Sequence, residues 1–457
     1  MSAEPALRSH IPAVTSGSYP VRSGNFVRAL VDGEAAFGRI CEAVEAAKKS
    51  VWVTIAFHKP DFAMPGGRGS LFDVLDKARA RGVDVRVIFW RTETAPGEHF
   101  FGSDEERTWL AARGSKFLAR WDRAQKNYCQ HQKSWLVDAG HPGETAFVGG
   151  INLMPSSVSA AGHANRDGNH THDVYLELRG PSATDVHHNF VQRWNEASER
   201  HREDGVWPSA GDNLPFPAVA SPVAGVSIVQ MQRTVRAGHY SDETPTPGGK
   251  SLPIAQGEFS VFDQYVKAID AARSAIYIED QYILSPDIVE RLHAALKRGV
   301  DVVFLCPAEP EEQVREGMMR DSAAPFRARL AALADHPNFL LAGIAAPQSD
   351  GKLKTIYVHD KIMLVDDAFA TIGSCNIASR SFFGDTELNA AVWDEDFVRA
   401  LRAELLQEHL GIDTSRMEDR DALALYREAA RANAQARHRG EAMNGLAFAL
   451  DPALYGS

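Results

Sequence analysis

Two segments of the sequence combine histidine, lysine and aspartate at the same spacing, H-x-K-x4-D. The first holds His131, Lys133 and Asp138 in QHQKSWLVDAG, and the second holds His359, Lys361 and Asp366 in VHDKIMLVDD. Imidazoles can attack as nucleophiles or transfer protons, and ammonium groups can hold anionic oxygens. One match carries little weight, but two at the same spacing argue against ordinary core histidines with solvated lysines and favour residues that face a ligand.

Each signature is expected on a strand, because each runs into apolar residues such as those at 135–137 and 362–365. Side chains alternate faces along a strand, so the histidine and lysine of one signature should point toward one ligand. The odd spacing from lysine to aspartate puts Asp138 and Asp366 on the opposite face. We therefore expect a structural role for these two members of the catalytic signature.

Small residues followed by an amide come after each signature, in Gly149-Gly150-Ile-Asn152 and in Gly373-Ser374-Cys-Asn376. Small residues let the backbone approach a phosphate, and an amide can donate hydrogen bonds to its oxygens. The candidate phosphate-binding residues are therefore Gly150, Asn152, Ser374 and Asn376.

The elements that must position these residues also occur twice. Residues 43–57 read AVEAAKKSVWVTIAF and residues 268–282 read AIDAARSAIYIEDQY, each a helix end followed by a β-branched and aromatic run. Arg-Gly-Val-Asp-Val at 81–85 recurs at 298–302, where a helix stops at a glycine and a buried strand begins. This alternation predicts an α/β fold with a mixed sheet and helices on both faces.

The boundary between the halves is predicted in VWPSAGDNLPFPAVASPVAG, a proline-rich stretch that cannot sustain a helix. We divide the chain into an N-terminal lobe, residues 1–205, a linker, residues 206–222, and a C-terminal lobe, residues 223–457. The last of these is expected to finish in a helical tail. A length of 457 residues also favours two domains.

Composition limits the partners. The formal charge of −11 gives no overall attraction to nucleic acid or to an anionic bilayer. The four cysteines stand singly, without the spacing of a zinc site or a disulfide framework, and are expected to be buried thiols. The N-terminal residues lack an apolar core and no apolar run is long enough to span a membrane, which predicts a cytoplasmic location.

A group of histidines in the first half could suggest a metal site; they are His163, His170, His172, His187 and His188. Their spacings fit no tight set of ligands with carboxylate or thiolate partners, so we expect a solvated loop and one helix face instead. The two signatures contain no cluster of metal ligands. We therefore expect no metal and no other cofactor.

The paired signatures resemble those of the phospholipase D superfamily, and the resemblance covers most of the chain. Further segments are similar to its phospholipid-cleaving branch: Gln232-Arg-Thr234, IYIEDQY from Ile276, FVQRWN from Phe190 and SRSFFGDTELN from Ser379. The resemblance implies two similar α/β/α sandwich lobes that face each other about a pseudo-two-fold axis. Both signatures would meet in one active site at the lobe interface.

The resemblance also implies a phosphohistidine mechanism. The lysines and asparagines would hold the phosphoryl oxygens, one histidine would attack phosphorus, and the other would protonate the leaving alcohol and then activate the acceptor. By the same analogy a carboxylate from the opposite half orients each histidine, so we pair Glu387 with His131 and Asp173 with His359. We take His131 as the nucleophile.

The expected function is that of a phospholipase D, which hydrolyses or transphosphatidylates glycerophospholipids with water or an alcohol as acceptor. Two alternatives remain, a cardiolipin synthase-type phosphatidyltransferase and a nuclease of the same superfamily. The first type usually carries N-terminal membrane segments, and the acidic balance disfavours the second. We expect a monomer that meets its phospholipid substrate peripherally at a membrane surface and binds no nucleic acid.

Overall fold

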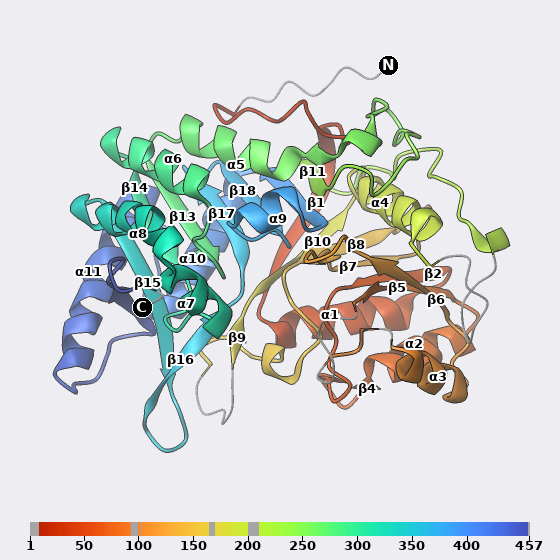
Figure 1. The fold of residues 1–457 in the computed structure, drawn as a ribbon, viewed down its shortest axis with the longest axis horizontal. Coiled ribbons are helices and arrows are strands. Elements are labelled where there is room, and N and C mark those ends of the chain that lie inside the picture. Colours follow the sequence, from red (N-terminus) through yellow and green to blue (C-terminus); the bar gives the residue numbers. More distant parts are fainter. Residues whose placement is uncertain (1–8, 93–98, 102, 164–169, 200–209, 456–457) are drawn as a thin grey trace.

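Two α/β/α lobes make up the fold in the computed structural model, which describes residues 9–92, 99–101, 103–163, 170–199 and 210–455. Figure 1 shows the first lobe in red to yellow and the second in green to blue, side by side. Each lobe holds a mixed sheet between layers of helices, which confirms the fold class expected from the sequence.

The sheet of the first lobe has the strand order β6-β5-β2-β7-β8-β10-β1, in which β2, β5 and β6 run parallel. The strands are β1 (Arg22–Val31), β2 (Ser50–Ile55), β5 (Asp84–Arg91), β6 (Leu118–Arg123), β7 (Ser134–Val137), β8 (Thr145–Gly149) and β10 (Val174–Arg179). One face packs against α1 (Gly33–Ala46), α2 (Leu71–Ala80) and α3 (Asp104–Ala112). The other face packs against α4 (Ala183–Glu196).

The sheet of the second lobe repeats this order as β15-β14-β13-β17-β18-β19-β11. Its strands are β11 (Ser227–Val235), β13 (Ala275–Asp280), β14 (Asp301–Leu305), β15 (Phe339–Pro347), β17 (Lys361–Val365), β18 (Phe369–Gly373) and β19 (Glu387–Trp393). Helices α5 (Ser260–Ala271), α6 (Pro286–Lys297) and α8 (Ala324–Ala331) cover one face. Helices α10 (Glu395–Leu410) and α11 (Asp419–His438) cover the other.

The repeated Arg-Gly-Val-Asp-Val segments have the same local structure in both lobes. Gly82 follows α2 and Gly299 follows α6, each with φ of 87°, a left-handed conformation that is strained for residues with a Cβ. The next strand then begins at Asp84 or at Asp301. The duplication read from the sequence is thus present in the order and the pairing of the strands.

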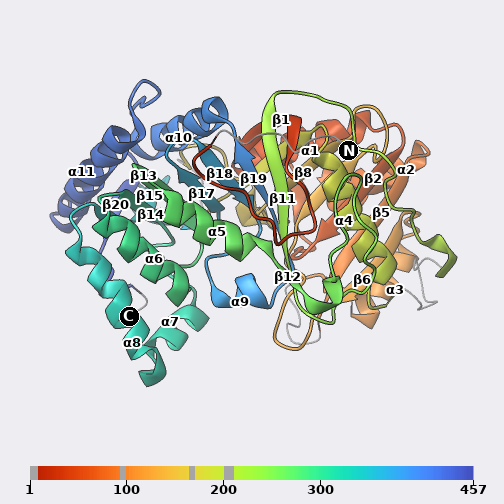
Figure 2. The same ribbon diagram turned by 90° about the horizontal axis from the view of Figure 1, so that it is seen from above.

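The two sheets join along one edge. β1 pairs antiparallel with β11, and Figure 2 shows the two strands side by side between the lobes. A second junction pairs β9 (Thr171–His172) in parallel with β16 (Leu353–Val358). One apolar core contains α4 from the first lobe together with α10 and α11 from the second. The lobes therefore share a continuous interior.

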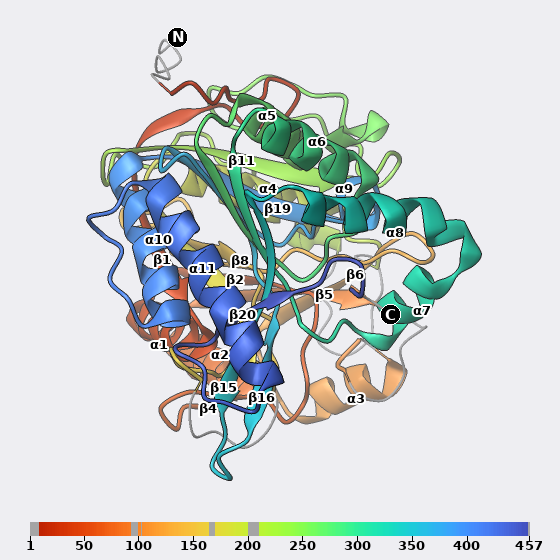
Figure 3. The ribbon, with the colours of Figure 1, turned by 90° about the vertical axis from the view of Figure 1, so that its left-hand side faces the viewer.

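Both ends of the described chain add to the second lobe. The Trp393 indole N–H donates to the carbonyl of Ile11 at 2.9 Å, and the Gln230 amide donates to the carbonyl of Val14 at 3.0 Å. At the other end, β20 (Ala447–Leu450) pairs with β15, and Figure 3 shows it beside α11. The C-terminal tail is therefore a helix followed by a strand, not helical throughout as expected.

The first residues of the predicted linker, 206–209, lie outside the described residues. From Ala210 to Val226 the chain has no strand, and it is fastened to the first lobe, for example by the hydrogen bond of 2.8 Å from the Ser221 amide to Thr184 Oγ1. The division at residues 206–222 stays a prediction.

The remaining short elements are β3 (Ala63–Met64), β4 (Gly69–Ser70), β12 (Glu258–Phe259), α7 (Glu312–Met319) and α9 (Ser379–Phe383). The four cysteines are buried free thiols, as expected. In the part of the chain that the structure describes, no helix is both long enough and apolar enough to cross a membrane.

Candidate active site

The two H-x-K segments lie at the lobe interface, at the beginnings of strands. β7 begins only at Ser134 and β17 at Lys361, so the prediction that each whole signature lies on a strand was wrong. The segments pair across the interface instead. The His131 backbone N–H donates to the carbonyl of Thr386 at 3.0 Å, and that of His359 donates to the carbonyl of His172 at 2.8 Å.

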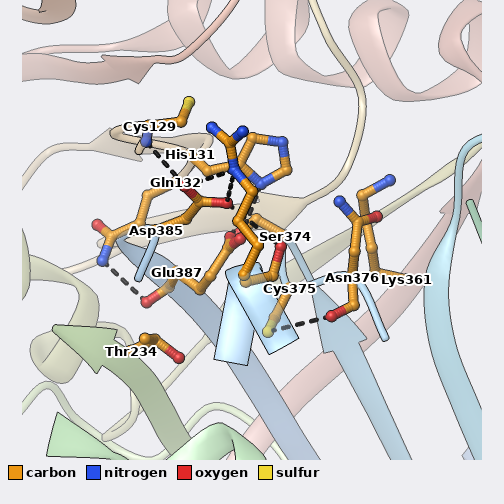
Figure 4. A network of polar contacts seen from close by, with 12 residues as sticks. Cys129, His131, Gln132, Thr234, Lys361, Ser374, Cys375, Asn376, Asp385 and Glu387 are labelled. Atoms are coloured by element: carbon orange, nitrogen blue, oxygen red, sulfur yellow. Dashed lines mark hydrogen bonds and ion pairs between the residues drawn. The ribbon is translucent and has the colours of Figure 1, made fainter. Parts of the chain in front are cut away.

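The residue after each of these acceptors is the carboxylate that the sequence analysis paired with the histidine. His131 Nδ1 lies 2.9 and 3.0 Å from the two oxygens of Glu387, and His359 Nδ1 lies 2.6 Å from Asp173 Oδ2. Figure 4 shows the first of these contacts. Each lobe therefore orients the histidine of the other, and the two contacts repeat the pseudo-two-fold symmetry of the fold.

The lysines fold back beside their histidines. Lys133 Nζ donates to the carbonyl of His131 at 2.8 Å, and Lys361 Nζ donates to the carbonyl of His359. The charged groups of the two H-x-K segments also affect each other's pKa values. Burial and the two ammonium groups, Lys361 and then Lys133, hold the pKa of His359 well below its usual range. A lysine of the first lobe thus contributes to the electrostatic environment of a histidine of the second.

The buried groups of the site have strongly shifted pKa values. Burial, with Lys133 next in importance, holds the pKa of His131 well below its usual range, so this imidazole is neutral and can offer a lone pair. Burial raises the pKa of Glu387 to about 8 and lowers that of Lys133 to about 8. A carboxyl group with a pKa near neutrality can hold or release the Nδ1 proton as the charge on the ring changes.

The backbone around Gly150 passes very close to the second signature. A Cβ at this position would lie 2.4 Å from Asp173 Oδ1 and 3.0 Å from Lys361 Cδ, so only glycine fits. The Asn152 side chain follows and places its amide nitrogen 3.3 Å from His359 Nε2. The first lobe thus supplies an amide beside the histidine of the second.

The second copy of this segment differs in one respect. Ser374 Oγ donates to Glu387 Oε2 at 2.5 Å, so its hydroxyl supports the carboxylate that contacts His131, and its expected contact with a phosphate stays a prediction. Asn376 is buried near Lys361 (Figure 4). Its side-chain oxygen and that of Asn152 lack hydrogen-bond partners among the described residues, so both amides have capacity left for a ligand.

The aspartates of the signatures lie away from this site. Asp138 accepts hydrogen bonds from the backbone N–H groups of residues 48–50, and Asp366 accepts them from those of residues 273–275. Both have a positive φ, 55° and 56°, in the turn after the strand. They fasten the starts of β2 and β13, which is the structural role that the odd spacing suggested.

The two sides of the site differ in polarity. Beside His131 stands an aromatic wall, in which the ring of Phe57 lies 6.0 Å from that of His131 and packs against Trp90 and Phe101. Beside His359 opens a cavity of about 360 Å³, with Glu309, Glu311 and Lys354 among its polar lining. The sequence analysis missed both sides, because single aromatic and acidic residues carry no motif.

The histidines of the first half are buried, so the solvated loop expected for them was wrong. His163 and His172 lie with Asp32 and Glu408, and the donor atoms of all four side chains are within 4.8 Å of one another. His187 pairs with Glu144 at 3.1 Å. The grouping of His163 and His172 with Asp32 and Glu408 could not be predicted from spacing, because the two carboxylates come from distant parts of the chain.

Family models match both lobes. One described as "Cardiolipin synthase, PLD-like domain" matches residues 40–194 and again residues 265–409, and one described as "Phospholipase D" matches residues 157–291. The two matches of the first model coincide with the two copies of the strand order described above.

Individual relatives cover most of the chain at low identity. Phospholipase D A of Dictyostelium discoideum is 26% identical over 488 residues, which is 86% of this chain and 36% of the relative. Cardiolipin synthase of Listeria monocytogenes is 23% identical over 390 residues, or 84% of this chain and 69% of the relative. The phosphatidylserine synthase structure from Haemophilus influenzae shares the fold, with a TM-score of 0.57 at 13% identity over 90% of this chain and 94% of that one.

Proposed function

This chain belongs to the family of cardiolipin synthase, PLD-like domains, and from that premise we propose that it is a phospholipase D-type phosphodiesterase acting on glycerophospholipids. The observation that carries the proposal is the arrangement at the lobe interface. Each lobe supplies a histidine, a lysine and an amide, and each also supplies the carboxylate that orients the other histidine. No metal is needed to neutralise the phosphate in this scheme, because two ammonium groups face it.

In the first step, Nε2 of His131 attacks phosphorus while Glu387 holds the Nδ1 proton. The bond from phosphorus to the head-group oxygen breaks, and His359 gives its Nε2 proton to that oxygen. A phosphate between Lys133 and Lys361 offsets their positive charge, which removes one cause of the low pKa of His359. Substrate binding thus favours the protonated acid that this step requires.

In the second step, His359 takes a proton from water or from an alcohol, and the resulting oxygen nucleophile attacks phosphorus. The phosphorus–nitrogen bond to His131 breaks and the enzyme is regenerated. Two displacements in succession give retention of configuration at phosphorus. The acceptor is water in hydrolysis and an alcohol in phosphatidyl transfer.

The two sides of the site support a phospholipid as substrate. The aromatic wall of Phe57, Trp90 and Phe101 suits the apolar diacylglycerol part, which stays on the His131 side as the phosphatidyl group. The cavity beside His359 suits the head group as it leaves and the acceptor as it enters. Glu309 and Glu311 there favour cationic or hydroxyl-rich head groups.

Partners and location follow from the same arrangement. One chain carries every group of the site, so we expect the protein to act as a monomer. Its lipid substrate requires contact with a membrane surface, which we expect to be peripheral. A nuclease would need a cationic groove for the nucleic acid backbone, and the formal charge of −11 is unfavourable for that.

Product analysis tests the proposal. Mixed phospholipid vesicles incubated with the protein should yield phosphatidic acid, and addition of a primary alcohol should divert the product to the phosphatidyl alcohol. His131→Ala should form neither product, while His141→Ala, which removes an exposed histidine, should behave as the parent. Release of diacylglycerol, or of no lipid product from any phospholipid class, would contradict the proposal.

Phosphatidyl transfer to a lipid alcohol is the second candidate, since relatives that the chain covers to 69% of their length are named cardiolipin synthase. Vesicles of phosphatidylglycerol alone distinguish the two. Cardiolipin as the main product, in excess of phosphatidic acid, favours the transferase, and the reverse ratio favours the phospholipase.

A further inference from the structure

A buried cluster of two histidines and two carboxylates lies behind His359, outside the proposed reaction. It consists of Asp32, His163, His172 and Glu408. We propose that this cluster binds one divalent transition-metal ion, with zinc as the best match, and that the ion fastens the lobes together next to the active site. The proposal does not depend on the reaction that the enzyme catalyses.

The spacing of the donor atoms fits a tetrahedral ion. Around zinc, with bonds of about 2.0 to 2.2 Å, neighbouring donor atoms lie about 3.3 to 3.6 Å apart. His163 Nε2 lies 3.4 Å from Asp32 Oδ2 and 3.4 Å from Glu408 Oε1. His172 Nδ1 approaches the same aspartate, at 3.0 Å from Oδ1. The four side chains come from different parts of the chain, and one donor atom of each lies within 4.8 Å of the others.

Asp32 gives independent support. Its side chain is 1% exposed, and Oδ2 has no hydrogen-bond partner among the described residues although it is directed at the cluster. Its ion-pair contact with His163 Nε2, at 3.4 Å, is not a hydrogen bond, and a buried carboxylate oxygen that accepts no hydrogen bond costs free energy unless a cation compensates it. An ion held between Asp32 and the imidazoles supplies that compensation.

The second nitrogen of His172 faces a buried carboxylate and a buried imidazole. His172 Nε2 lies at an ion-pair distance of 3.2 Å from Glu279 Oε2 and 3.3 Å from His409 Nε2, its hydrogen-bond partner. A contact that occupies Nε2 orients the ring and leaves the Nδ1 lone pair for the metal. Tyr277 donates to the other oxygen of Glu279 at 2.5 Å and holds that carboxylate in place.

The donor set selects the class of ion. Two imidazoles with two carboxylates suit zinc and its neighbours in the first transition row. Magnesium and calcium prefer a shell of oxygen ligands only, so the two histidines disfavour them.

The position of the cluster suggests what the ion does. Asp32 and both histidines belong to the first lobe, whereas Glu408 belongs to α10 of the second, so the ion would link the two lobes. The carbonyl of His172 accepts the His359 N–H, and the next residue, Asp173, orients the His359 ring. The ion would therefore hold the backbone from which His359 takes both contacts.

Metal content of the full chain tests the proposal. The protein, dialysed free of loosely bound ions, should carry about one zinc per chain by elemental mass spectrometry. Glu408→Gln keeps an oxygen that can accept the Gly162 amide and removes the charge, so it should retain less than about a tenth of the ion. His163→Asn should lose it as well. Glu395→Gln, at an exposed position of the same helix, should retain it.

Thermal unfolding gives a second measurement, which does not depend on how much metal remains bound during purification. Zinc returned to the stripped parent should raise its unfolding temperature and should leave that of Glu408→Gln unchanged. A stripped parent that takes up no transition metal at concentrations up to about 10 µM would overturn the proposal. So would retention of the ion by both Glu408→Gln and His163→Asn, because the ion would then be bound elsewhere.

Discussion

His131 and His359 have matching contacts in the two lobes, yet the proposed mechanism gives them different tasks. Each donates its backbone N–H to the opposite lobe and has a carboxylate at Nδ1. The difference lies in what stands beside the ring, an aromatic wall at His131 and a polar cavity at His359. The leaving alcohol must reach solvent through the polar side, which favours His359 as the acid.

A substrate with an activated leaving group separates the two tasks. In His359→Ala, a phosphatidyl ester of p-nitrophenol should leave a phosphatidyl-enzyme that intact mass spectrometry detects, because its leaving group needs no acid. His131→Ala should form none. On ordinary phospholipid, both variants should lose turnover by about a thousandfold or more. An adduct on His359 that persists in His131→Ala would reverse the assignment and leave the phosphohistidine mechanism intact.

Lys133 should impose a pH limit on anion binding. Its pKa is lowered to about 8, mainly by burial. The negative charge of Glu387 raises this pKa in part, and the positive charge of Lys361 lowers it further. The ammonium group is therefore present below this pH and lost as the pH rises through it. Dimethyl phosphate keeps its single charge throughout, and its Kd should weaken at least about tenfold between about pH 7 and pH 10. In Lys133→Met, binding should be weak at all pH values, and an unchanged pH dependence there would exclude Lys133 as the cause.

At the residue scale, the sequence predicted the cross-lobe contacts of His131 and His359 but not the surroundings. The pairing came from the family resemblance, not from residue spacing. The burial of His163 and His172 could not be foreseen, because the nearest carboxylate partner of His172 is Asp32, 140 positions away in the chain. A hydroxyl such as that of Ser374 can likewise serve a ligand or a neighbour, and only the fold decides which.

Among the elements, β7 and β17 each separate the proposed catalytic histidine and lysine of a signature, near the start of the strand, from the aspartate just after its end. At about 3.3 Å per residue, the four residues of β7 separate Lys133 from Asp138 by roughly 13 Å or more. The aspartate accepts three backbone N–H groups at the start of β2. We therefore expect it to contribute to the stability of the sheet and not to the reaction.

Asp138→Ala should separate stability from activity. Loss of an acceptor for three N–H groups should lower the free energy of unfolding by roughly 2 kcal/mol, as measured by urea denaturation. The kcat of the folded variant should stay within about threefold of the parent, because no group of the site moves. Asp61→Ala, an exposed control, should change neither quantity. A thousandfold loss of kcat in a stably folded Asp138→Ala would place the aspartate in the reaction.

The sequence predicted the alternation of helices and strands along each half more completely than it predicted the ends of the strands. The repeated Gly82 and Gly299 marked the starts of β5 and β14, because a left-handed glycine closes the preceding helix in both lobes. Residues 131–133 resembled strand residues equally well. They lie outside the sheet because the backbone at His131 pairs with the other lobe. Such a contact between lobes produces no pattern in the sequence of either segment.

The charge of the whole molecule should govern how it meets a membrane. With a formal charge of −11, the protein should be repelled by an anionic surface, most strongly at low ionic strength, where the Debye length is about 30 Å in 0.01 M salt and about 8 Å at 0.15 M. Initial rates on zwitterionic vesicles should fall as oleate is added at low salt and recover at high salt. A rate that rises with oleate would show a local cationic surface that outweighs the net charge.

The crossed orientation of the two histidines also determines how activity depends on protein concentration. A chain with one H-x-K signature would hold a histidine without its carboxylate, and two such chains would have to associate, so that activity would vanish on dilution by mass action. Because both copies here belong to one chain, each partner is present at a fixed effective concentration. Specific activity should therefore be independent of dilution. The two copies are also free to diverge, as Asp173 and Glu387 already have, because neither must match a copy of itself.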